Sequence, residues 1–381
     1  MSVNAQGVWP KKANFGGLGR MAATGFSIGT KGYIGIGAGL SYYKDFWEYD
    51  PSVNTWTQKA DFGGTGRAYA TGFSIGTKGY IGMGQDNPTD HLKDFWEYDP
   101  FSNTWTQKTD FGGITRGDVT GFSIGTKGYI GTGWDGVYYY KDFWEYDPST
   151  NTWMQKADFG GTARADATSF SIGTKGYIVT GVNYPNFYKD FWEYDPSSNT
   201  WTKKADFGGM GRMYATGFSI DQKGYIGTGT NVSSNFKDFW EYDPSSDTWT
   251  KKADFGDTER NCATGFSIGT KGYIGTGFDY YSMRKDFWEY DPGTTGVNTL
   301  HEKPLAVSLF PNPVSDYLYI SYPYRNALSV EVYDLSGHLL INENERKEAV
   351  TKVNFSTLVA GVYIIKISDA ISYTSQRVIK Q

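Results

Sequence analysis

The sequence has little cysteine, histidine or charge. It holds 1 Cys and 3 His among 381 residues, and only 20% of its residues are charged. A single cysteine cannot form an intrachain disulfide, and three histidines leave little for a His-rich metal site. A net charge of −5 gives no support for nucleic-acid binding. No apolar run approaches the ~18 residues of a membrane-spanning helix.

Glycine and aromatic residues are abundant instead. The chain contains 49 Gly, and 18% of its residues are Phe, Trp or Tyr. Disordered chains have few aromatics and a high net charge, so this composition argues against disorder. Glycine destabilises helices, so it also argues against an all-helical protein. Many short strands joined by glycine-rich turns are the better prediction.

Two strings repeat along most of the chain. The octapeptide Lys-Asp-Phe-Trp-Glu-Tyr-Asp-Pro occurs six times, with copies that start 48 or 49 residues apart. The string Gly-Phe-Ser-Ile-Gly-Thr-Lys-Gly-Tyr-Ile also recurs six times, with substitutions in the fourth and fifth copies. A period of this length, rich in Gly and Trp, is typical of propeller blades rather than of helical repeats.

Each repeat divides into four strand-like pieces. In the second repeat these are residues 70–75, 80–84 and 94–98 and a piece that starts at Thr104, with a turn predicted over 76–79. Four antiparallel strands form one blade. The last repeat has Val297 where the outer-strand tryptophan is expected, whereas Trp9 precedes the first repeat. We therefore expect the segment around Trp9 to complete the last blade, which hides the sheet edges.

The repeats resemble the kelch motif. The resemblance rests on an Arg before the first strand, Tyr-Ile-Gly-x-Gly in the second, Tyr-Asp-Pro after the third, and a Trp shortly afterwards. It covers roughly residues 8–297 and implies that the first strand of each blade lines a central channel. The predicted fold is all-β, with a six-bladed kelch-type β-propeller over residues 7–297.

The composition changes after Pro292. From Pro304 onward tryptophan is absent, and Val, Ile and Leu alternate with polar residues, which predicts a small Ig-like β-sandwich over residues 304–381. Phe310-Pro311-Asn312-Pro313, Val332-Tyr333-Asp334-Leu335-Ser336-Gly337 and Leu358-Val359-Ala360-Gly361-Val362-Tyr363 resemble the type A C-terminal sorting domain of the type IX secretion system. An accessory sandwich with a ligand of its own is the alternative.

The resemblance of the tail implies the type IX machinery as a partner. It also implies export to the outer surface or the medium of a Gram-negative bacterium, usually followed by removal of the tail. Such export needs a signal peptide, and residues 1–6 contain neither a charged n-region nor an apolar core. Val3-Asn4-Ala5 suits the end of a signal peptide, so we expect the natural chain to start upstream of Met1.

The six copies differ from one another in two places. These are the loop after the second strand and the segment that leads into the first strand. Antiparallel strand order puts both on one face of the ring, which we call the variable face, and puts the Gly-Thr-Lys-Gly and Asp-Pro turns on the other. We interpret the variable face as a binding surface. The alternative is the ordinary tolerance of loops to sequence change.

Aromatic residues in these loops are candidates for ligand binding. Trp134 is the only tryptophan outside the repeated framework, and Tyr138, Tyr184 and Tyr280 lie in the same kind of loop. Aromatic rings beside Asp and Asn suit sugars, because a ring packs on C–H faces while polar groups bind hydroxyls. Packing of these rings against each other at the rim is the alternative.

Six arginines are further candidates, because a ring of guanidinium groups can bind a carboxylate or sulfate. Pairing of each arginine with a neighbouring carboxylate is the alternative. The six are Arg20, Arg67, Arg116, Arg164, Arg212 and Arg260.

Two residues beyond each arginine, the chemistry varies from blade to blade. The copies read Ala22, Tyr69, Asp118, Asp166, Tyr214 and Cys262. Asp118 and Asp166 come from adjacent blades, so they are candidates to share a cation or a proton. Tyr69 and Tyr214 flank them in an asymmetric pocket. A solvated mouth without a ligand is the alternative.

The residues do not identify an enzyme. Galactose oxidase shares kelch blades, but it needs copper held by His and Tyr and a Tyr–Cys crosslink, and this propeller has one His and one Cys. No phosphate loop, catalytic triad or zinc spacing is present. We predict no metal, no cofactor and no catalytic residue.

The predicted function is therefore non-catalytic binding of a glycan or a protein. One alternative is a carbohydrate-active enzyme, mutarotase-like or hydrolase-like, that uses the channel mouth. It predicts loss of turnover when Asp118 or Asp166 becomes Asn, whereas a lectin-like module loses binding with Trp134→Ala. A structural adhesin without a small ligand is the second alternative.

Overall fold

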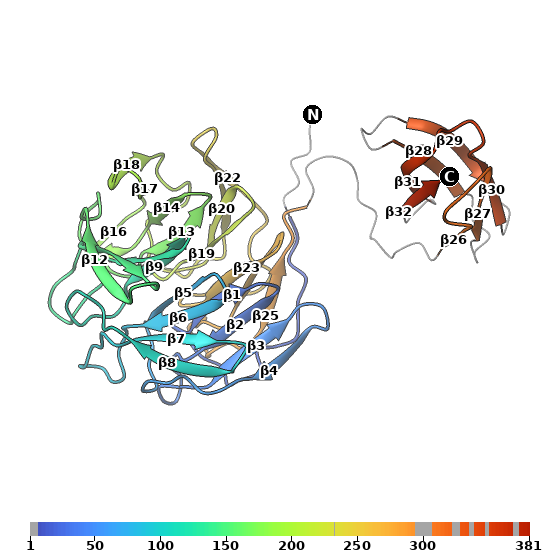
Figure 1. Ribbon diagram of the computed structural model, residues 1–381. Helices are drawn as coiled ribbons and strands as arrows, with labels where there is room; N and C mark the ends of the chain where they lie inside the picture. Colours follow the sequence, from blue (N-terminus) through green and yellow to red (C-terminus); the bar gives the residue numbers. More distant parts are fainter. Residues whose placement is uncertain are drawn as a thin grey trace. The chain divides into compact units, whose positions relative to one another are not determined.

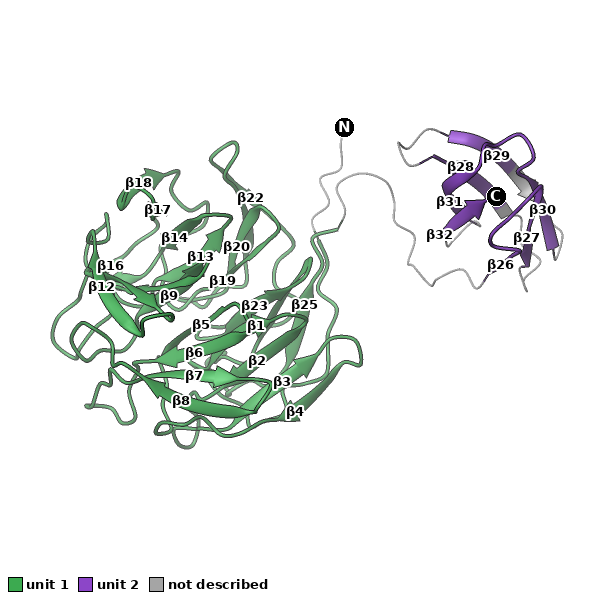
Figure 2. Ribbon diagram, viewed as in Figure 1, with its two compact units in different colours: residues 1–293 green, residues 294–381 purple. Residues whose placement is uncertain are grey.

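A computed structural model describes residues 7–231, 233–293, 307–321, 328–334, 339–346, 350–368 and 373–381. The proposed signal-peptide remnant before Gln6, the linker and Val297 lie outside these residues. The chain divides into two compact units, residues 1–293 and 294–381, and each is described by itself (Figure 2). Every regular element in the described residues is a β-strand. These residues contain no helix long and apolar enough to cross a membrane.

Unit 1 is a ring of six antiparallel sheets, five with four strands and one with three (Figure 1). The innermost strands are β1 (Thr24–Ile28), β5 (Thr71–Ile75), β9 (Thr120–Ile124), β13 (Thr168–Ile172), β19 (Thr216–Ile220) and β23 (Thr264–Ile268). Each of these contacts the next, and β23 contacts β1, so the ring is closed. The all-β propeller expected from the repeats is confirmed.

The other strands follow in the same order in every blade. The second strands are β2 (Lys31–Gly35), β6 (Lys78–Gly82), β10 (Lys127–Gly131), β14 (Lys175–Val179), β20 (Lys223–Gly227) and β24 (Lys271–Gly275). The third are β3 (Phe46–Asp50), β7 (Phe95–Asp99), β11 (Phe143–Asp147), β17 (Phe191–Asp195), β21 (Phe239–Asp243) and β25 (Phe287–Tyr290). The fourth are β4 (Thr55–Gln58), β8 (Thr104–Lys108), β12 (Thr152–Lys156), β18 (Thr200–Lys204) and β22 (Thr248–Lys251). One loop of the variable face forms the short hairpin β15 (Val182–Asn183) and β16 (Asn186–Phe187).

The first turn of each blade is tighter than the sequence predicted. In the second blade Lys78 pairs with Ile75, and Gly79 pairs with Ser74, so only Gly76 and Thr77 form the turn. Gly76 has a φ of 57°, which glycine adopts at no steric cost. Such a two-residue turn matches the twist of antiparallel strands, so the hairpin starts two residues earlier than expected on its second strand.

The hydrophobic core lies between neighbouring blades rather than inside one. Phe26, Tyr33 and Phe46 of the first blade pack with Ile81 and Tyr98 of the second. Glycine in the second strand permits this approach, because a Cβ at Gly79 would lie 2.3 Å from the Phe26 ring. The repeated Lys-Gly-Tyr-Ile string is thus explained by packing between blades.

The N-terminal segment supplies the missing outer strand of the three-stranded sheet β23–β24–β25. Val8 and Asp291 exchange backbone hydrogen bonds of 2.9 and 3.0 Å, and Lys12 N–H donates to Phe287 at 2.8 Å. Trp9 packs on Phe239, with ring centroids 4.9 Å apart, as the outer-strand tryptophans of the other blades do with their neighbours. The expected closure by this segment is therefore observed.

Unit 2 consists of two antiparallel sheets. One has the order β26–β27–β30 and the other β29–β28–β31–β32. Their bounds are β26 (Ser308–Phe310), β27 (Tyr317–Ser321), β28 (Leu328–Tyr333), β29 (Leu339–Arg346), β30 (Val350–Asn354), β31 (Gly361–Ser368) and β32 (Tyr373–Lys380). Side chains from both sheets, including Leu318, Ile320, Val332 and Ile365, form one buried core. This arrangement agrees with the predicted sandwich.

Candidate functional site

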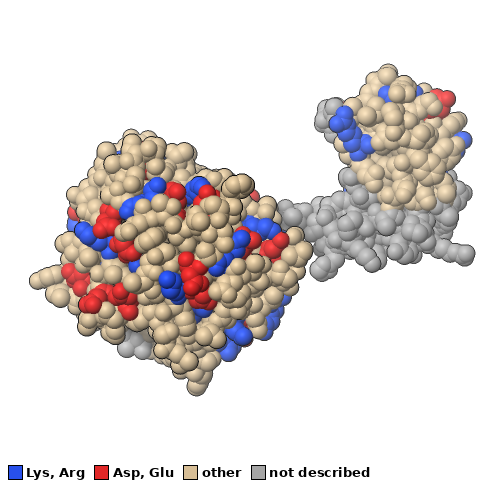
Figure 3. All heavy atoms as spheres, turned by 60° about the horizontal axis from the view of Figure 1, so that its bottom comes forward, with Lys and Arg blue, Asp and Glu red and all other residues tan. Residues whose placement is uncertain are grey.

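The two variable segments of each blade lie side by side. The residue after each framework arginine forms a β-bridge with the loop that follows the second strand of the same blade, as Gly117 does with Trp134 and Ala165 with Val182. The opposite face repeats one ion pair at its turns, exemplified by Lys78 and Asp99 with 2.6 Å between Nζ and Oδ2. Figure 3 shows basic and acidic side chains interspersed over the propeller surface in view, without a large area of one sign. Charge alone therefore selects no ligand for that surface.

The six arginines do not face a ligand, and this corrects the interpretation of them as an anion-binding ring. All six are 0–1% exposed. Arg116 donates two hydrogen bonds to Asp142, of 2.5 and 2.8 Å, and one of 3.0 Å to the carbonyl of Thr132. Although burial opposes ionisation, the bonds and the charge of Arg116 lower the pKa of Asp142. Arg20, Arg67, Arg164, Arg212 and Arg260 pair in the same way with Asp45, Asp94, Asp190, Asp238 and Asp286.

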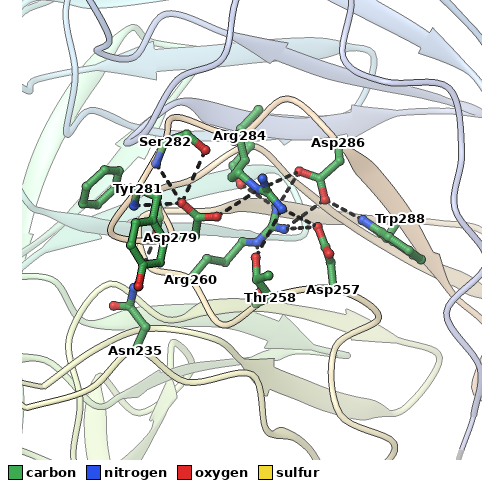
Figure 4. A network of polar contacts seen from close by, with 12 residues as sticks. Asn235, Asp257, Thr258, Arg260, Asp279, Tyr281, Ser282, Arg284, Asp286 and Trp288 are labelled. Atoms are coloured by element: carbon green, nitrogen blue, oxygen red, sulfur yellow. Dashed lines mark hydrogen bonds and ion pairs between the residues drawn. The ribbon is translucent and has the colours of Figure 1, made fainter.

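The sixth blade departs from this pattern (Figure 4). A phenylalanine ring lies over the guanidinium in every blade, and in four blades a second ring from the variable loop covers it as well, as Tyr140 covers Arg116 at 4.1 Å. Arg284 occupies the equivalent position in the sixth blade, and Asp257 replaces a glycine of the other repeats. Asp257 accepts hydrogen bonds from Arg260 at 2.8 Å and from Arg284 at 3.0 Å. The added acid thus compensates the added base, and the network is structural.

Six residues at the channel mouth form a closed ring of backbone hydrogen bonds. The N–H of Asp118 donates to the carbonyl of Tyr69 at 3.0 Å, and the N–H of Asp166 donates to that of Asp118 at 3.0 Å. Every member has a left-handed backbone, with φ between 49° and 57°. The members are Ala22, Tyr69, Asp118, Asp166, Tyr214 and Cys262, and the last bond runs from Ala22 N–H to Cys262. These are the same six positions that the sequence comparison between blades singled out.

The side chains of this ring line a cavity of about 130 Å³. Tyr69 and Tyr214 come from opposite blades, and their ring centroids lie 5.9 Å apart. Asp118 and Asp166 stand together on one side, and each has a buried Oδ1 without a hydrogen-bond partner. Alanines and Cys262 form the rest of the wall, so one half of the mouth is acidic and the other is small and apolar.

Burial dominates the electrostatics of the acidic half. Burial raises the pKa of Asp118 to about 6. It also raises the pKa of Asp166 well above its ordinary value, and the nearby charge of Asp118 adds to this effect. Two carboxyl groups so close together cannot both ionise cheaply, so the pair shares a proton near neutral pH. The pair can act as an acid, as a base or as an anionic partner.

Because the pKa values of Asp118 and Asp166 are raised, we expect the free energy of unfolding to fall as pH rises. The folded state holds its proton more tightly than the unfolded chain, whose Asp pKa is about 3.9. The contribution of this pair to the free energy of unfolding is therefore fully present below about pH 4. It is lost as pH rises through about 6 for Asp118. We expect Asp118→Asn to raise the free energy of unfolding at pH 8 by on the order of 2 kcal/mol and to have less effect at pH 5.

Tryptophan fluorescence during urea unfolding measures this effect, because all 13 Trp lie in the propeller repeats or the closing segment. Asp61→Asn, at an exposed position of the variable face, is the matched control. Equal pH dependence of the wild type and Asp118→Asn would contradict the assignment of a raised pKa to this pair.

The aromatic candidates occupy different positions around the mouth. Tyr138, Tyr184 and Tyr280 are exposed by 67%, 56% and 50%. The Tyr184 hydroxyl lies 3.8 Å from Sδ of Met213, the residue before Tyr214 of the mouth, and burial raises its pKa. Trp134 is half-buried and packs edge-on against His91, with ring centroids 5.8 Å apart. Three candidates are thus largely exposed, whereas Trp134 is partly covered by its contact with His91.

Sequence reasoning did not select His91 as a site residue. Its Nε2 is buried without a hydrogen-bond partner, and burial lowers its pKa. The one available signal was that His91 is the only histidine of the propeller repeats. Within the described residues no three His, Cys, Asp or Glu side chains are grouped to hold a metal ion.

Comparison with known proteins agrees with both units. Residues 163–208 match the kelch motif, and residues 308–381 match the secretion system C-terminal sorting domain. The fold is similar to that of a solved structure of YjhT, with a TM-score of 0.64 and 17% identity over 73% of this chain and 95% of that chain. The comparison with curated proteins gave no match. Both resemblances inferred from the repeats and the tail are therefore confirmed.

Proposed function

We propose that this chain, a kelch propeller with a type IX sorting tail, is an exported module that binds a glycan or a protein through its variable face. The tail supports export to the medium or the cell surface and handling by the type IX machinery. In this proposal residues 7–297 form the binding domain and residues 304–381 form the sorting domain.

One observation carries the binding proposal. The variable face exposes tyrosines from three blades, and the Tyr184 hydroxyl lies 3.8 Å from Sδ of Met213, the residue before Tyr214 of the channel mouth. Aromatic side chains are enriched in interfaces relative to the rest of a protein surface. The opposite face carries repeated turns and paired charges instead. The division between the two faces follows from function if the variable face meets the ligand.

We expect Tyr184→Ala to weaken ligand binding about tenfold or more, because an aromatic anchor contributes at least 1–2 kcal/mol to an interface. The measurement is a glycan array probed with the full chain, followed by capture of cell-envelope proteins if the array is silent. Tyr138→Ala extends the test to the next blade. Both side chains are exposed, so the fold is expected to survive their removal.

The matched control is Phe101→Ala, because Phe101 is 98% exposed on the opposite face. Loss of binding with Phe101→Ala but not with the tyrosine variants would place the ligand on the wrong face for this proposal. No ligand of either class, with folded protein, would favour a structural adhesin.

A carbohydrate-active enzyme is the second candidate, and the acidic pair favours it. A carboxyl group with a raised pKa in a cavity is suited to general acid–base catalysis. Asp118→Asn and Asp166→Asn would then abolish turnover while binding to the rim persists. Screening of sugar substrates by NMR distinguishes this candidate from a binding module.

A further inference from the structure

The mouth of the channel has buried carboxyl oxygens that no hydrogen bond reaches. The side chains of Asp118 and Asp166 interact with each other, and that of Asp166 with Tyr214, but Oδ1 of Asp118 and Oδ1 of Asp166 lack hydrogen-bond partners. The backbone at this level cannot serve them, because its N–H groups are used in the closed ring. A buried carboxylate oxygen without a donor is costly, so this half of the mouth is complementary to a ligand that brings N–H donors and positive charge.

The two tyrosines that flank the acidic pair suit the same kind of ligand. Tyr69 and Tyr214 meet across the channel axis with 5.9 Å between ring centroids. An aromatic face attracts a cation within about 6 Å. The cavity of about 130 Å³ admits only a small group. Negative charge, aromatic faces and limited room together are the features that recognise an organic cation.

We propose that the channel mouth binds an alkylammonium group, held by Asp118 and Asp166 and packed against Tyr69 and Tyr214. Calcium fits less well, because it takes six to eight oxygen ligands and the mouth supplies two carboxyl groups. The alkyl chain has apolar wall to pack on, since the cavity adjoins the channel below it and both are lined by alanines, among them Ala70 and Ala215. This site does not rest on binding by the exposed tyrosines, and it uses the acidic pair of the second candidate function.

Binding is coupled to release of a proton. The acidic pair holds a proton near neutral pH because burial raises the pKa of both carboxyl groups. A bound cation favours the ionised pair and displaces that proton, so affinity rises with pH through about 6 and falls below it. Burial also raises the pKa of the other titratable groups around the pair, which therefore remain neutral and do not compete. They are Tyr69, Tyr184, Tyr214 and Cys262.

Isothermal titration calorimetry of the full chain with n-butylammonium chloride tests the proposal. We expect a dissociation constant in the millimolar range, on the order of 1 mM, and proton release that is counted by repeating the titration in buffers of different ionisation enthalpy. n-Butanol, which has the same length without the charge, should not bind. Calcium chloride is the probe for a metal site.

Variants locate the binding. Asp118→Asn and Asp166→Asn keep the shape of the side chain and should each weaken n-butylammonium binding about tenfold or more, because a charge-assisted hydrogen bond is lost. Asp61→Asn, on an exposed loop of the same face, should leave binding unchanged. Tyr69→Leu removes an aromatic face without changing the charge and should weaken binding less.

Three results would overturn the proposal. They are no binding at about 50 mM n-butylammonium, equal binding by the wild type and both Asn variants, and calcium binding that the same variants abolish. Circular dichroism verifies that each variant is folded. If an Asn variant does not fold, the affinity of Tyr69→Leu for n-butylammonium and the number of protons released by the wild type test the site instead. Unchanged affinity of Tyr69→Leu together with no proton release would reject the site.

Discussion

Asp142→Ala is expected to lower the free energy of unfolding of the propeller by about 3–5 kcal/mol. Asp142 is the only carboxylate bonded to Arg116 among the described residues. Arg116 is fully buried, so it would keep its charge without a counterion. The stacked ring of Tyr140 at 4.1 Å cannot replace that counterion, because a cation–π contact contributes only about 1–2 kcal/mol.

Urea unfolding followed by tryptophan fluorescence measures this loss. Asp158→Ala is the matched control, since Asp158 belongs to the same blade and pairs with Lys141 at 3.9 Å while both side chains are about half exposed. An exposed pair of this kind contributes about 0–1 kcal/mol. If both variants lost the same stability, the buried position of the Arg–Asp pair would have no energetic importance.

Trp9→Ala is expected to destabilise the propeller by about 3 kcal/mol, in the range for removal of a large aromatic side chain. Trp9 packs on Phe239, Phe255 and Tyr290 with centroid distances of 4.9–5.1 Å, and its N–H donates to the carbonyl of Ala253. Its loss loosens the segment that covers β25, and an uncovered strand edge pairs with other chains. We therefore expect lower unfolding temperature together with concentration-dependent oligomers.

Val8→Ala is the control for this second variant, because Val8 lies on the same strand and is 61% exposed. Calorimetry gives the unfolding temperature, and size-exclusion chromatography with light scattering gives the oligomeric state. A monomeric Trp9→Ala protein with wild-type stability would show that the ring does not depend on this tryptophan.

The fold was predictable because the chain contains six versions of one blade. Repetition revealed the period, and substitutions between copies separated the packing residues from the loops. The boundary at Lys78 was missed because a two-residue turn with a left-handed glycine needs less chain than a four-residue turn. Local propensity does not determine how early a hairpin begins to pair.

The candidate site was predictable in part. Variation after each arginine identified the mouth residues, including Asp118 and Asp166. The arginines themselves were ambiguous, because repetition suits either a ligand ring or an internal ion pair. The choice depends on whether Arg116 reaches Asp142, which is 26 residues away along the chain, and such proximity arises only when the blade folds. The backbone ring at the mouth left no sequence signal, since main-chain atoms make it.

At the channel mouth the main chain determines the shape of the closed ring, and the side chains determine its chemistry. Its six hydrogen bonds use main-chain atoms alone, so exchanging a side chain there removes none of them. A left-handed backbone disfavours β-branched residues most, and Ala, Tyr, Asp and Cys already occupy these six positions in one molecule. Side chains other than proline can therefore be exchanged at six positions on a constant scaffold, by evolution or by design. New specificities at the end of the channel would then require substitutions but no remodelling of the blades.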